Sequence, residues 1–310
     1  MSLVLNSKKI IFIVGPTGVG KSETAVALAK RIKGEIISCD SMQIYKGMDI
    51  ITSKPPLSLR KKVRHHLIGA ISASGEYNVS RYRKDALKKI RNIIKRGKVP
   101  ICAGGTGLYM SVLINGIFDL NSKNNAVRKH LIKLAEIKGS SFIYKKLQEV
   151  DPVASAKIHP HDVKRIVRAL EVFEVAGSPI SQLQKQRKGL SEEFDINIIG
   201  LNRKRDELYR LIDERVDGMF EQGLLQEAKR LLKSRLSKTA RLVIGLRELK
   251  GYFDGLYNLD EARRLIKRNT RQYAKRQLTW FRKDKRIQWI KLKEGDSSTQ
   301  VAQRIMRAAS

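Results

Sequence analysis

The first third of the chain alternates short apolar runs with segments in which apolar residues recur every three or four positions. Three runs have the length of buried strands: 10–14, 35–39 and 98–103. Helical spacing is found in three segments between and after them: 23–32, 79–94 and 108–113. Because strands and helices alternate, the pattern predicts an α/β fold with a parallel sheet flanked by helices. Ligands of such sheets bind beyond the carboxyl ends of the strands.

The pattern changes after residue 117, where strand-like runs give way to basic, amphipathic segments. Helices are predicted at 125–138, 142–149 and 161–176, followed by a polar, basic stretch at 181–193. We interpret 118–194 as an all-helical insertion domain and assign 1–117 and 195–310 to the core. The second part of the core is predicted to contain a strand at 195–201 and helices at 205–221, 224–233 and 260–283.

Residues 15–22 read Gly-Pro-Thr-Gly-Val-Gly-Lys-Ser, which is the G-x-x-x-x-G-K-S pattern of a phosphate-binding P-loop. The predicted strand before it and the predicted helix after it are the context that this motif requires. Its glycines allow backbone N–H groups to face an anion, while Lys21 reaches the phosphates and the Ser22 hydroxyl holds Mg²⁺. The core is therefore predicted to be P-loop NTPase-like, with a polyphosphate site whose ligand need not be a nucleotide.

The chain is strongly basic, with 63 Lys and Arg residues against 30 Asp and Glu residues and a net charge of +33. Like charges destabilise a compact fold, so the excess favours a polyanionic partner, with nucleic acid first and an anionic membrane surface second. A Lys-rich background composition would explain part of it. The predicted helix 260–283 combines basic residues with Tyr273, Trp280 and Phe281, a mixture that is typical of RNA contact.

The apolar runs are all shorter than the roughly 18–20 residues needed to span a bilayer. Residues 1–9 lack the long apolar core of a signal peptide. Cys39 and Cys102 each lie in a strand-like run, so free buried thiols are expected. We therefore predict a cytoplasmic protein with no membrane partner.

Asp40 directly follows the apolar run 35–39. A carboxylate in this position can help to hold Mg²⁺ in a P-loop protein, or it can cap a helix. The polar residues that follow, among them Ser41 and Gln43, suggest a third role. A carboxylate can accept a proton from the exocyclic amine of a base, while Gln43 reads an adenine edge. These alternatives stay open at the level of the residues.

Taken together, the motifs resemble those of the bacterial-type tRNA dimethylallyltransferases, also called tRNA isopentenyltransferases, over nearly the whole chain. The P-loop 15–22 is the first of them. The others follow in the order of that family: Asp40-Ser41-x-Gln43 with Tyr45 and 46–49, then 65–67, 104–109, 270–277 and 279–282. One departure is Leu242, where some members carry Arg.

The resemblance implies transfer of a dimethylallyl group from dimethylallyl diphosphate to N6 of the adenosine immediately 3′ of the anticodon, position 37 of tRNA. It implies that Asp40 is the general base and that Thr17 contacts the bridging oxygen or the diphosphate. Lys21 and Ser22 would hold the diphosphate and Mg²⁺. The residues implied to bind the diphosphate are Gly15, Pro16, Thr17, Gly18, Val19, Gly20, Lys21, Ser22 and Arg215.

The resemblance also implies a tRNA contact surface, with the anticodon stem-loop as the partner of a monomeric enzyme. Asp40, Ser41, Met42 and Gln43 would surround a flipped-out adenine. The other implied contacts are Thr106, Arg128, Lys164, Arg165, Ile166, Val167, Arg168, Leu242, Val243, Ile244, Gly245, Leu246, Arg247, Lys275, Arg276, Gln277, Trp280, Phe281 and Arg282.

Two other functions compete with this interpretation. A small-molecule P-loop kinase would use the same loop and Asp40, but it would leave the excess of positive charge without a role. A nucleic-acid-binding protein without transferase activity would use the charge but would not need Asp40.

Overall fold

The structure is a computed structural model that describes residues 8–118 and 125–309 of the 310-residue chain. Residues 1–7, in which we expect no signal peptide, and residues 119–124, at the start of the predicted insertion, lie outside the described residues. The described chain forms two compact units: 1–114 with 193–310, and 115–192.

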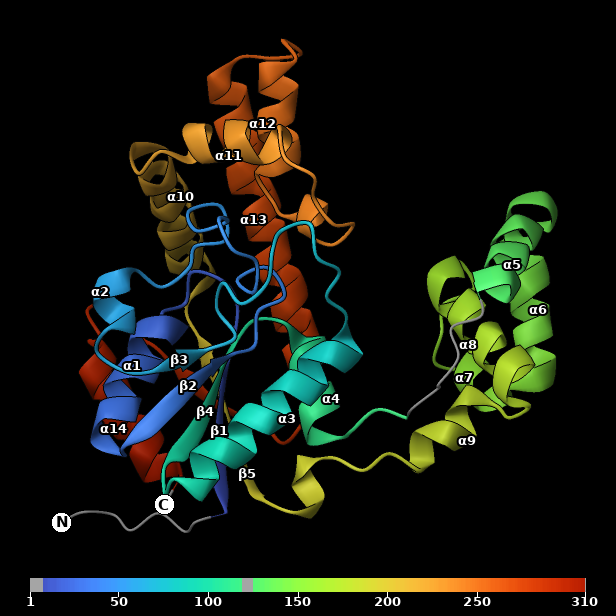
Figure 1. Ribbon diagram of the computed structural model, residues 1–310, viewed down its shortest axis with the longest axis horizontal. Helices are drawn as coiled ribbons and strands as arrows, with labels where there is room; N and C mark the ends of the chain where they lie inside the picture. The colour runs from blue at the N-terminus through green and yellow to red at the C-terminus, as the bar shows by residue number, and fades with distance from the viewer. Residues whose placement is uncertain (1–7, 119–124, 310) are drawn as a thin grey trace. The chain divides into compact units, whose positions relative to one another are not determined.

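The larger unit contains a sheet of six strands, drawn as arrows in Figure 1, in the order β3-β2-β4-β1-β5-β6. All neighbouring strands pair in parallel, as the sequence predicts. The strands are β1 Lys9–Val14, β2 Gly34–Ser38, β3 His65–His66, β4 Val99–Gly104, β5 Asp195–Asn202 and β6 Gln288–Lys291. The two edge strands β3 and β6 are short and were not predicted, because neither has an apolar run of its own.

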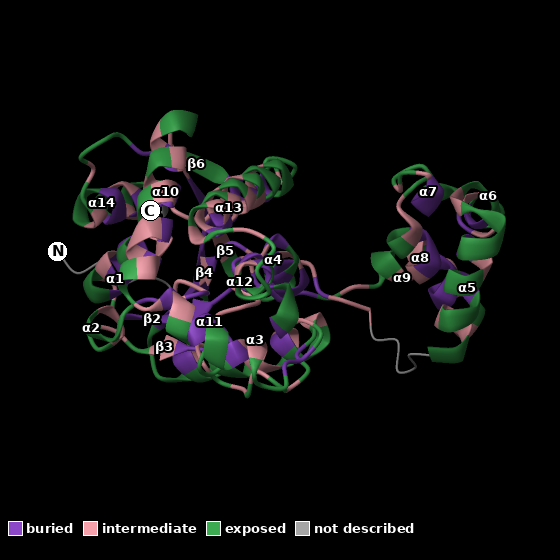
Figure 2. Cartoon of the chain, turned by 90° about the horizontal axis from the view of Figure 1, so that it is seen from above, coloured by how far each residue is buried: buried purple, intermediate pink, exposed green. Residues whose placement is uncertain are grey.

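Helices lie on both faces of the sheet (Figure 1). On one face, Ile11 and Ile13 of β1 belong to an apolar core that includes residues of α1 and α14. On the other face, the Cys39 sulfur lies 2.9 Å from the Tyr82 hydroxyl of α3. The helices of this unit, with one 3₁₀ turn, are α1 Lys21–Arg31, α2 Leu57–Arg60, α3 Val79–Lys95, α4 Gly107–Ile114, α10 Arg205–Glu221, α11 Leu224–Leu232, η2 Ala240–Leu242, α12 Leu246–Phe253, α13 Leu259–Phe281 and α14 Ser298–Ala309. A second 3₁₀ turn, η1 Leu190–Glu192, belongs to the smaller unit. Figure 2 shows buried residues on the strands and many exposed residues along α13.

The smaller unit is helical and has its own apolar core, which is visible as buried patches in Figure 2. Leu131 of α5, Ile143 of α6 and Ile166 of α8 are all fully buried in it or nearly so. The helices of this unit are α5 Asn125–Lys138, α6 Ser140–Val150, α7 Pro152–Ser155, α8 Val163–Ala176 and α9 Ile180–Lys185. In neither unit is a described helix long and apolar enough to cross a bilayer.

A buried carboxylate ties β2 to its two neighbours in the sheet, β3 and β4. Glu35 of β2 is 1% exposed, and Arg96 donates to it at 2.5 and 2.7 Å. Lys98 donates at 2.9 Å from just before β4, and His66 of β3 at 2.8 Å. These hydrogen bonds, led by Arg96, hold the pKa of Glu35 well below its usual range. Burial lowers the pKa of His66, so its imidazole is neutral near pH 7 and donates from Nε2.

We predict that Glu35→Gln lowers the free energy of unfolding at pH 7 by about 1–3 kcal/mol, because it weakens a buried, charge-assisted cluster. The stabilisation from a carboxylate with a depressed pKa is complete above its unfolded pKa of about 4.3 and is lost as the pH falls. Urea denaturation should therefore show the difference narrowing below about pH 4.3. Glu193→Gln is the control, since Glu193 pairs with Arg91 at 3.3 Å on the surface. Equal stability of Glu35→Gln and the parent chain at pH 7 would contradict the prediction.

Candidate active site

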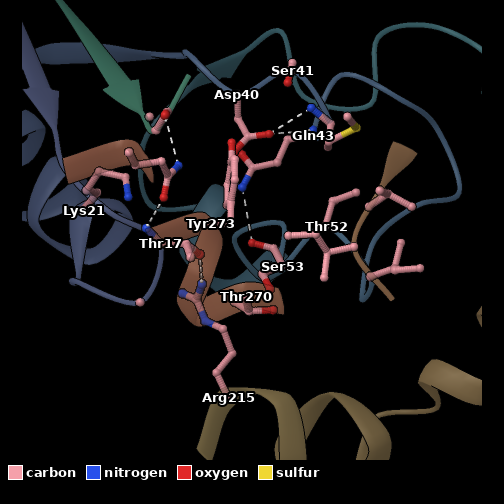
Figure 3. A pocket seen from close by; sticks show the side chains of 18 of the residues that line it. Thr17, Lys21, Asp40, Ser41, Gln43, Thr52, Ser53, Arg215, Thr270 and Tyr273 are labelled. Carbon is pink, nitrogen blue, oxygen red and sulfur yellow. Dashed lines mark hydrogen bonds between the residues drawn. The ribbon is translucent and has the colours of Figure 1, made fainter. Parts of the chain in front are cut away.

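Three turns that follow neighbouring strands line one pocket of about 390 Å³ in the larger unit (Figure 3). They are the P-loop after β1, the turn at Asp40 after β2 and the turn at Gly105 after β4. The strand order β2-β4-β1 places their carboxyl ends side by side. The prediction that these three turns share a cleft is confirmed.

The P-loop bends tightly enough to wrap around an anion. Gly15, Gly18 and Gly20 have φ values of 146°, 83° and 100°, which side chains rarely tolerate. Helix α1 begins at Lys21, so its positive end lies at the loop. Thr17, Gly18, Gly20, Lys21 and Ser22 all line the pocket.

Two cations converge on this loop. The Lys21 amine donates to the Pro16 carbonyl at 2.6 Å, and Arg215 of α10 donates to the Thr17 hydroxyl at 3.0 Å. Burial, reinforced by the charge of Arg215, lowers the pKa of Lys21 to about 7. Burial also lowers the pKa of Arg215. Because both cations are poorly solvated, the pocket favours a multiply charged anion between them.

The Asp40 carboxylate is held in a fixed orientation. Its Oδ1 accepts the backbone N–H groups of Met42 at 2.8 Å and Gln43 at 3.3 Å, shown as dashed lines in Figure 3. Residues 41–44 form a turn, so Asp40 caps a turn and not a helix. Within the described chain, no hydrogen bond engages its second oxygen. That oxygen can accept a proton from a group in the pocket.

The turn after β4 fixes the turn that carries Asp40. The Thr106 N–H donates to the Cys39 carbonyl at 3.1 Å, and the Thr106 hydroxyl accepts the Ser41 N–H at 3.1 Å. A Cβ atom on Gly104 would lie 2.3 Å from the same Cys39 carbonyl oxygen. The two turns therefore approach more closely than any residue with a side chain would allow.

The Gln43 side chain has a defined amide orientation. Its Oε1 accepts the Ser38 hydroxyl at 3.2 Å, and its Nε2 donates to the Ser53 carbonyl at 3.3 Å. Ser53 has a φ of 48°, an uncommon conformation for a residue with a side chain. Such strain often accompanies functional sites. Asp40 and Gln43 thus present an acceptor and an oriented amide to one pocket.

Apolar side chains line another part of the pocket, and the sequence analysis missed them. They are Ile51, Val216, Met219 and Ile266, together with Val243 and Ile244 from the predicted tRNA contacts. The Glu227 carboxylate, on α11, holds the segment that carries Ile51 by accepting the N–H groups of residues 49–51 at 2.8 to 3.1 Å. These residues come from distant segments and form no motif, so the sequence carried no local signal for them.

Helix α13 lines the pocket through Thr270, Tyr273, Arg276 and Gln277. Burial raises the pKa of Tyr273 to about 12, and the neighbouring Asp40 carboxylate acts in the same direction. Lys275, Arg276, Trp280 and Arg282 are exposed, as a contact surface requires. Phe281 is 1% exposed and Gln277 is 5% exposed. The tRNA contacts of these two residues stay predictions, and Gln277 also lines the pocket.

The segment 242–247 divides in the same way. Leu242 is 74% exposed and lies at the pocket, and Arg247 is exposed. Val243 and Ile244 line the pocket. Gly245 and Leu246 are buried where α12 begins, and the tRNA contact of this segment stays a prediction.

Within the helical unit, Ile166 and Val167 are buried in the apolar core, with exposed fractions of 0% and 1%. The predicted tRNA contact of this stretch stays a prediction. Lys164 and Arg165 on the same helix are exposed. Arg168 and Arg128 both approach the buried Glu171 carboxylate, at 3.0 and 3.5 Å. One carboxylate thus orients two half-exposed guanidinium groups.

Sequence comparisons connect this geometry with known enzymes. The family model described as IPP transferase matches residues 43–284. A tRNA dimethylallyltransferase of Alkaliphilus oremlandii is 44% identical over 303 residues, which are 97% of this chain and 96% of that protein. A tRNA dimethylallyltransferase of Carboxydothermus hydrogenoformans is 47% identical over 286 residues, 92% of each chain.

Solved structures agree with the sequence comparisons. The full-length tRNA isopentenylpyrophosphate transferase of Bacillus halodurans superposes with a TM-score of 0.71 at 37% identity and 97% coverage of both chains. A eukaryotic dimethylallyltransferase described as acting on tRNA gives a TM-score of 0.81 at 33% identity, over 96% of this chain and 78% of that one. The chain therefore belongs to the IPP transferase family.

Proposed function

We propose that this protein transfers a dimethylallyl group from dimethylallyl diphosphate to N6 of the adenosine at position 37 of tRNA, next to the anticodon. One observation carries the proposal: a single pocket combines a cationic P-loop, a fixed carboxylate and an apolar lining. A small prenyl diphosphate needs the cationic P-loop for its diphosphate and the apolar lining for its carbon chain. An adenine whose amine must lose a proton needs the fixed carboxylate.

The cradle would act on the leaving group. As the bond between the allylic carbon and the bridging oxygen breaks, negative charge develops on the diphosphate, and Lys21 and Arg215 stabilise it. Arg215 also orients the Thr17 hydroxyl, with which it shares a 3.0 Å hydrogen bond. That hydroxyl would donate to the departing oxygen. The apolar residues around Met219 and Ile266 would hold the carbon chain and exclude water.

Asp40 would act on the acceptor. The exocyclic nitrogen of adenine forms a bond to the allylic carbon and loses one proton, which the free oxygen of Asp40 accepts. The products are N6-(dimethylallyl)adenosine and diphosphate. Gln43 would bind the adenine through its oriented amide. The target base must leave the anticodon-loop stack, which costs a few kcal/mol that tRNA contacts elsewhere can offset.

The pocket also fits Mg²⁺, which prefers oxygen ligands and is commonly held by few protein groups together with substrate phosphates. The Ser22 hydroxyl and the Asp40 carboxylate both line the pocket. The described residues contain no cluster of three or more His, Cys, Asp or Glu side chains that could hold a metal without the substrate. We propose that Ser22 and the diphosphate hold the ion, which would neutralise charge on the leaving group.

A small-molecule kinase is the weaker candidate. It would leave the apolar lining without a role, and the excess of 33 positive charges would serve no substrate. We assign that charge to tRNA, with contacts on α13 and on exposed residues of the helical unit. We propose that the enzyme acts as a monomer in the cytoplasm.

We predict that the protein, incubated with Mg²⁺, dimethylallyl diphosphate and unmodified tRNA, forms N6-alkylated adenosine detectable by nucleoside mass spectrometry. Asp40→Asn should lower kcat by about 10²–10⁴-fold, because the general base is lost. Its affinity for tRNA should stay within about twofold, because the amide keeps the shape of the carboxylate. ATP hydrolysis without prenyl transfer by the parent chain would overturn the proposed function.

We predict that binding of dimethylallyl diphosphate at pH 8 takes up most of one proton. With a pKa of about 7, the Lys21 amine is largely neutral at that pH, and an adjacent anion raises its pKa. Affinity should therefore fall as the pH rises above about 7. Calorimetry in buffers of different ionisation enthalpy measures the uptake. Lys21→Arg, whose side chain is charged at every pH tested, should show no proton uptake. If the heat of binding to the parent chain were the same in all buffers, proton uptake by Lys21 would be refuted.

We predict that Lys275→Ala and Arg276→Ala each weaken tRNA binding at low salt. Each should also make the slope of log affinity against log salt concentration shallower by about one, because one phosphate contact is lost. The comparison variant is Lys95→Ala, which removes an exposed charge at the end of α3, shortly before β4 begins. Lys95 thus lies near the amino end of β4, whereas the pocket lies at the carboxyl ends of the strands. Binding titrations over a range of salt concentrations separate the two sites. The same loss in all three variants would argue against a specific surface on α13.

A further inference from the structure

Gln277 makes two hydrogen bonds to backbone groups of two other segments of the site. Its Oε1 accepts the Thr17 N–H at 2.8 Å, and its Nε2 donates to the Gly105 carbonyl at 3.0 Å. The residue lies on α13, 260 positions from Thr17 in sequence. Its side chain thus bridges the P-loop and the turn after β4, and it anchors both to a long helix.

The surroundings of Gln277 are built around its amide. A Cβ atom on Gly105 would lie 2.1 Å from Nε2, so only glycine leaves room for the amide at this position. Tyr273, one helical turn earlier on α13, lines the same pocket as Gln277. With 5% exposure, the amide is shielded from competing water. Both the oxygen and the nitrogen of this buried amide are hydrogen-bonded. The side chain therefore favours one orientation, because any other orientation would leave buried polar groups without partners.

We propose that Gln277 is a positioning residue for the proposed prenyl transfer, and that it acts through Thr17. The backbone N–H of Thr17 is fixed by Gln277, and its hydroxyl is fixed by Arg215. Two constraints on one residue set the position of the hydroxyl that faces the leaving diphosphate. The predicted effect of Gln277 on the rate rests on the proposed function. The predicted effect of Gln277 on diphosphate binding does not.

Its position on α13 separates this role from RNA contact. Lys275 and Arg276, just before Gln277, are exposed, while Gln277 is buried. The helix thus presents charge on its outer side and a structural amide on its inner side. Removing the amide should disturb the cradle and leave the outer surface intact.

The test uses the full chain with inorganic diphosphate and Mg²⁺ as the probe, and it measures tRNA affinity separately. Gln277→Leu should weaken diphosphate binding and lower kcat by about tenfold each, the loss expected for a buried hydrogen-bonded pair. The tRNA dissociation constant should stay within about twofold. Gln272→Leu, an exposed glutamine on the same helix, is the control and should change none of the three quantities.

A double-mutant cycle with Thr17→Ala tests whether Gln277 acts through Thr17. In the Thr17→Ala background, Gln277→Leu should lower kcat by less than about threefold further. Additive losses would overturn the inference, as would weakened tRNA binding with unchanged diphosphate binding. Gln277→Glu checks the hydrogen-bond pattern: it keeps an acceptor for Thr17 but cannot donate to Gly105, so it should also weaken diphosphate binding. The effect of Gln277→Leu on diphosphate binding can be measured even if the parent chain shows no prenyl transfer. Failure of the inference is therefore distinguishable from failure of the proposed function.

Discussion

The structure depends on an electrostatic imbalance at the carboxyl edge of the sheet. Lys21 and Arg215 lie at the P-loop, where burial lowers the pKa of both groups and the charge of Arg215 lowers the pKa of Lys21 further. The negative charge of Asp40 acts in the opposite direction and raises the pKa of both groups. Its Oδ1, however, is engaged by backbone amides of its own turn. A multiply charged anion, as proposed, would balance this positive charge. The chemistry proposed above places that anion where its charge increases during the reaction.

Rigid support of the Asp40 turn is the second requirement. Three neighbouring strands end together, and the turn after β4 packs so closely on β2 that Gly104 has no room for a side chain. Glu35 joins β2, β3 and the start of β4 from the other end. Catalytic groups on such a scaffold need little reorganisation to reach their working geometry.

Much of the fold was predictable because its signals are local. The apolar run before the P-loop, the glycines in it and the helical period after it lie within about 25 residues and predict one βα unit. Helices α5 and α10 begin and end at the predicted residues, Asn125–Lys138 and Arg205–Glu221. The shared pocket followed from a general rule for parallel sheets, which needs only the position of each strand end.

The sequence alone did not separate exposed from buried residues within a contiguous stretch. On a helix, neighbours in sequence point in different directions, so a stretch such as 164–168 contains both exposed Lys164 and buried Ile166. Gln277 lies beside basic residues in sequence but is buried, so its neighbours gave no signal of its hydrogen bonds to Thr17 and Gly105. The apolar lining and Glu227 were missed because they are brought together only by tertiary structure.

The central claim is that one pocket holds a diphosphate at Lys21 and Arg215 while Asp40 faces the amine of an adenine. A crystal structure with an anticodon stem-loop and an unreactive analogue of dimethylallyl diphosphate tests it most directly. The account predicts a carboxylate oxygen of Asp40 about 3 Å from N6, with the diphosphate in the P-loop. An adenine bound away from Asp40, or a diphosphate outside the P-loop, would contradict it.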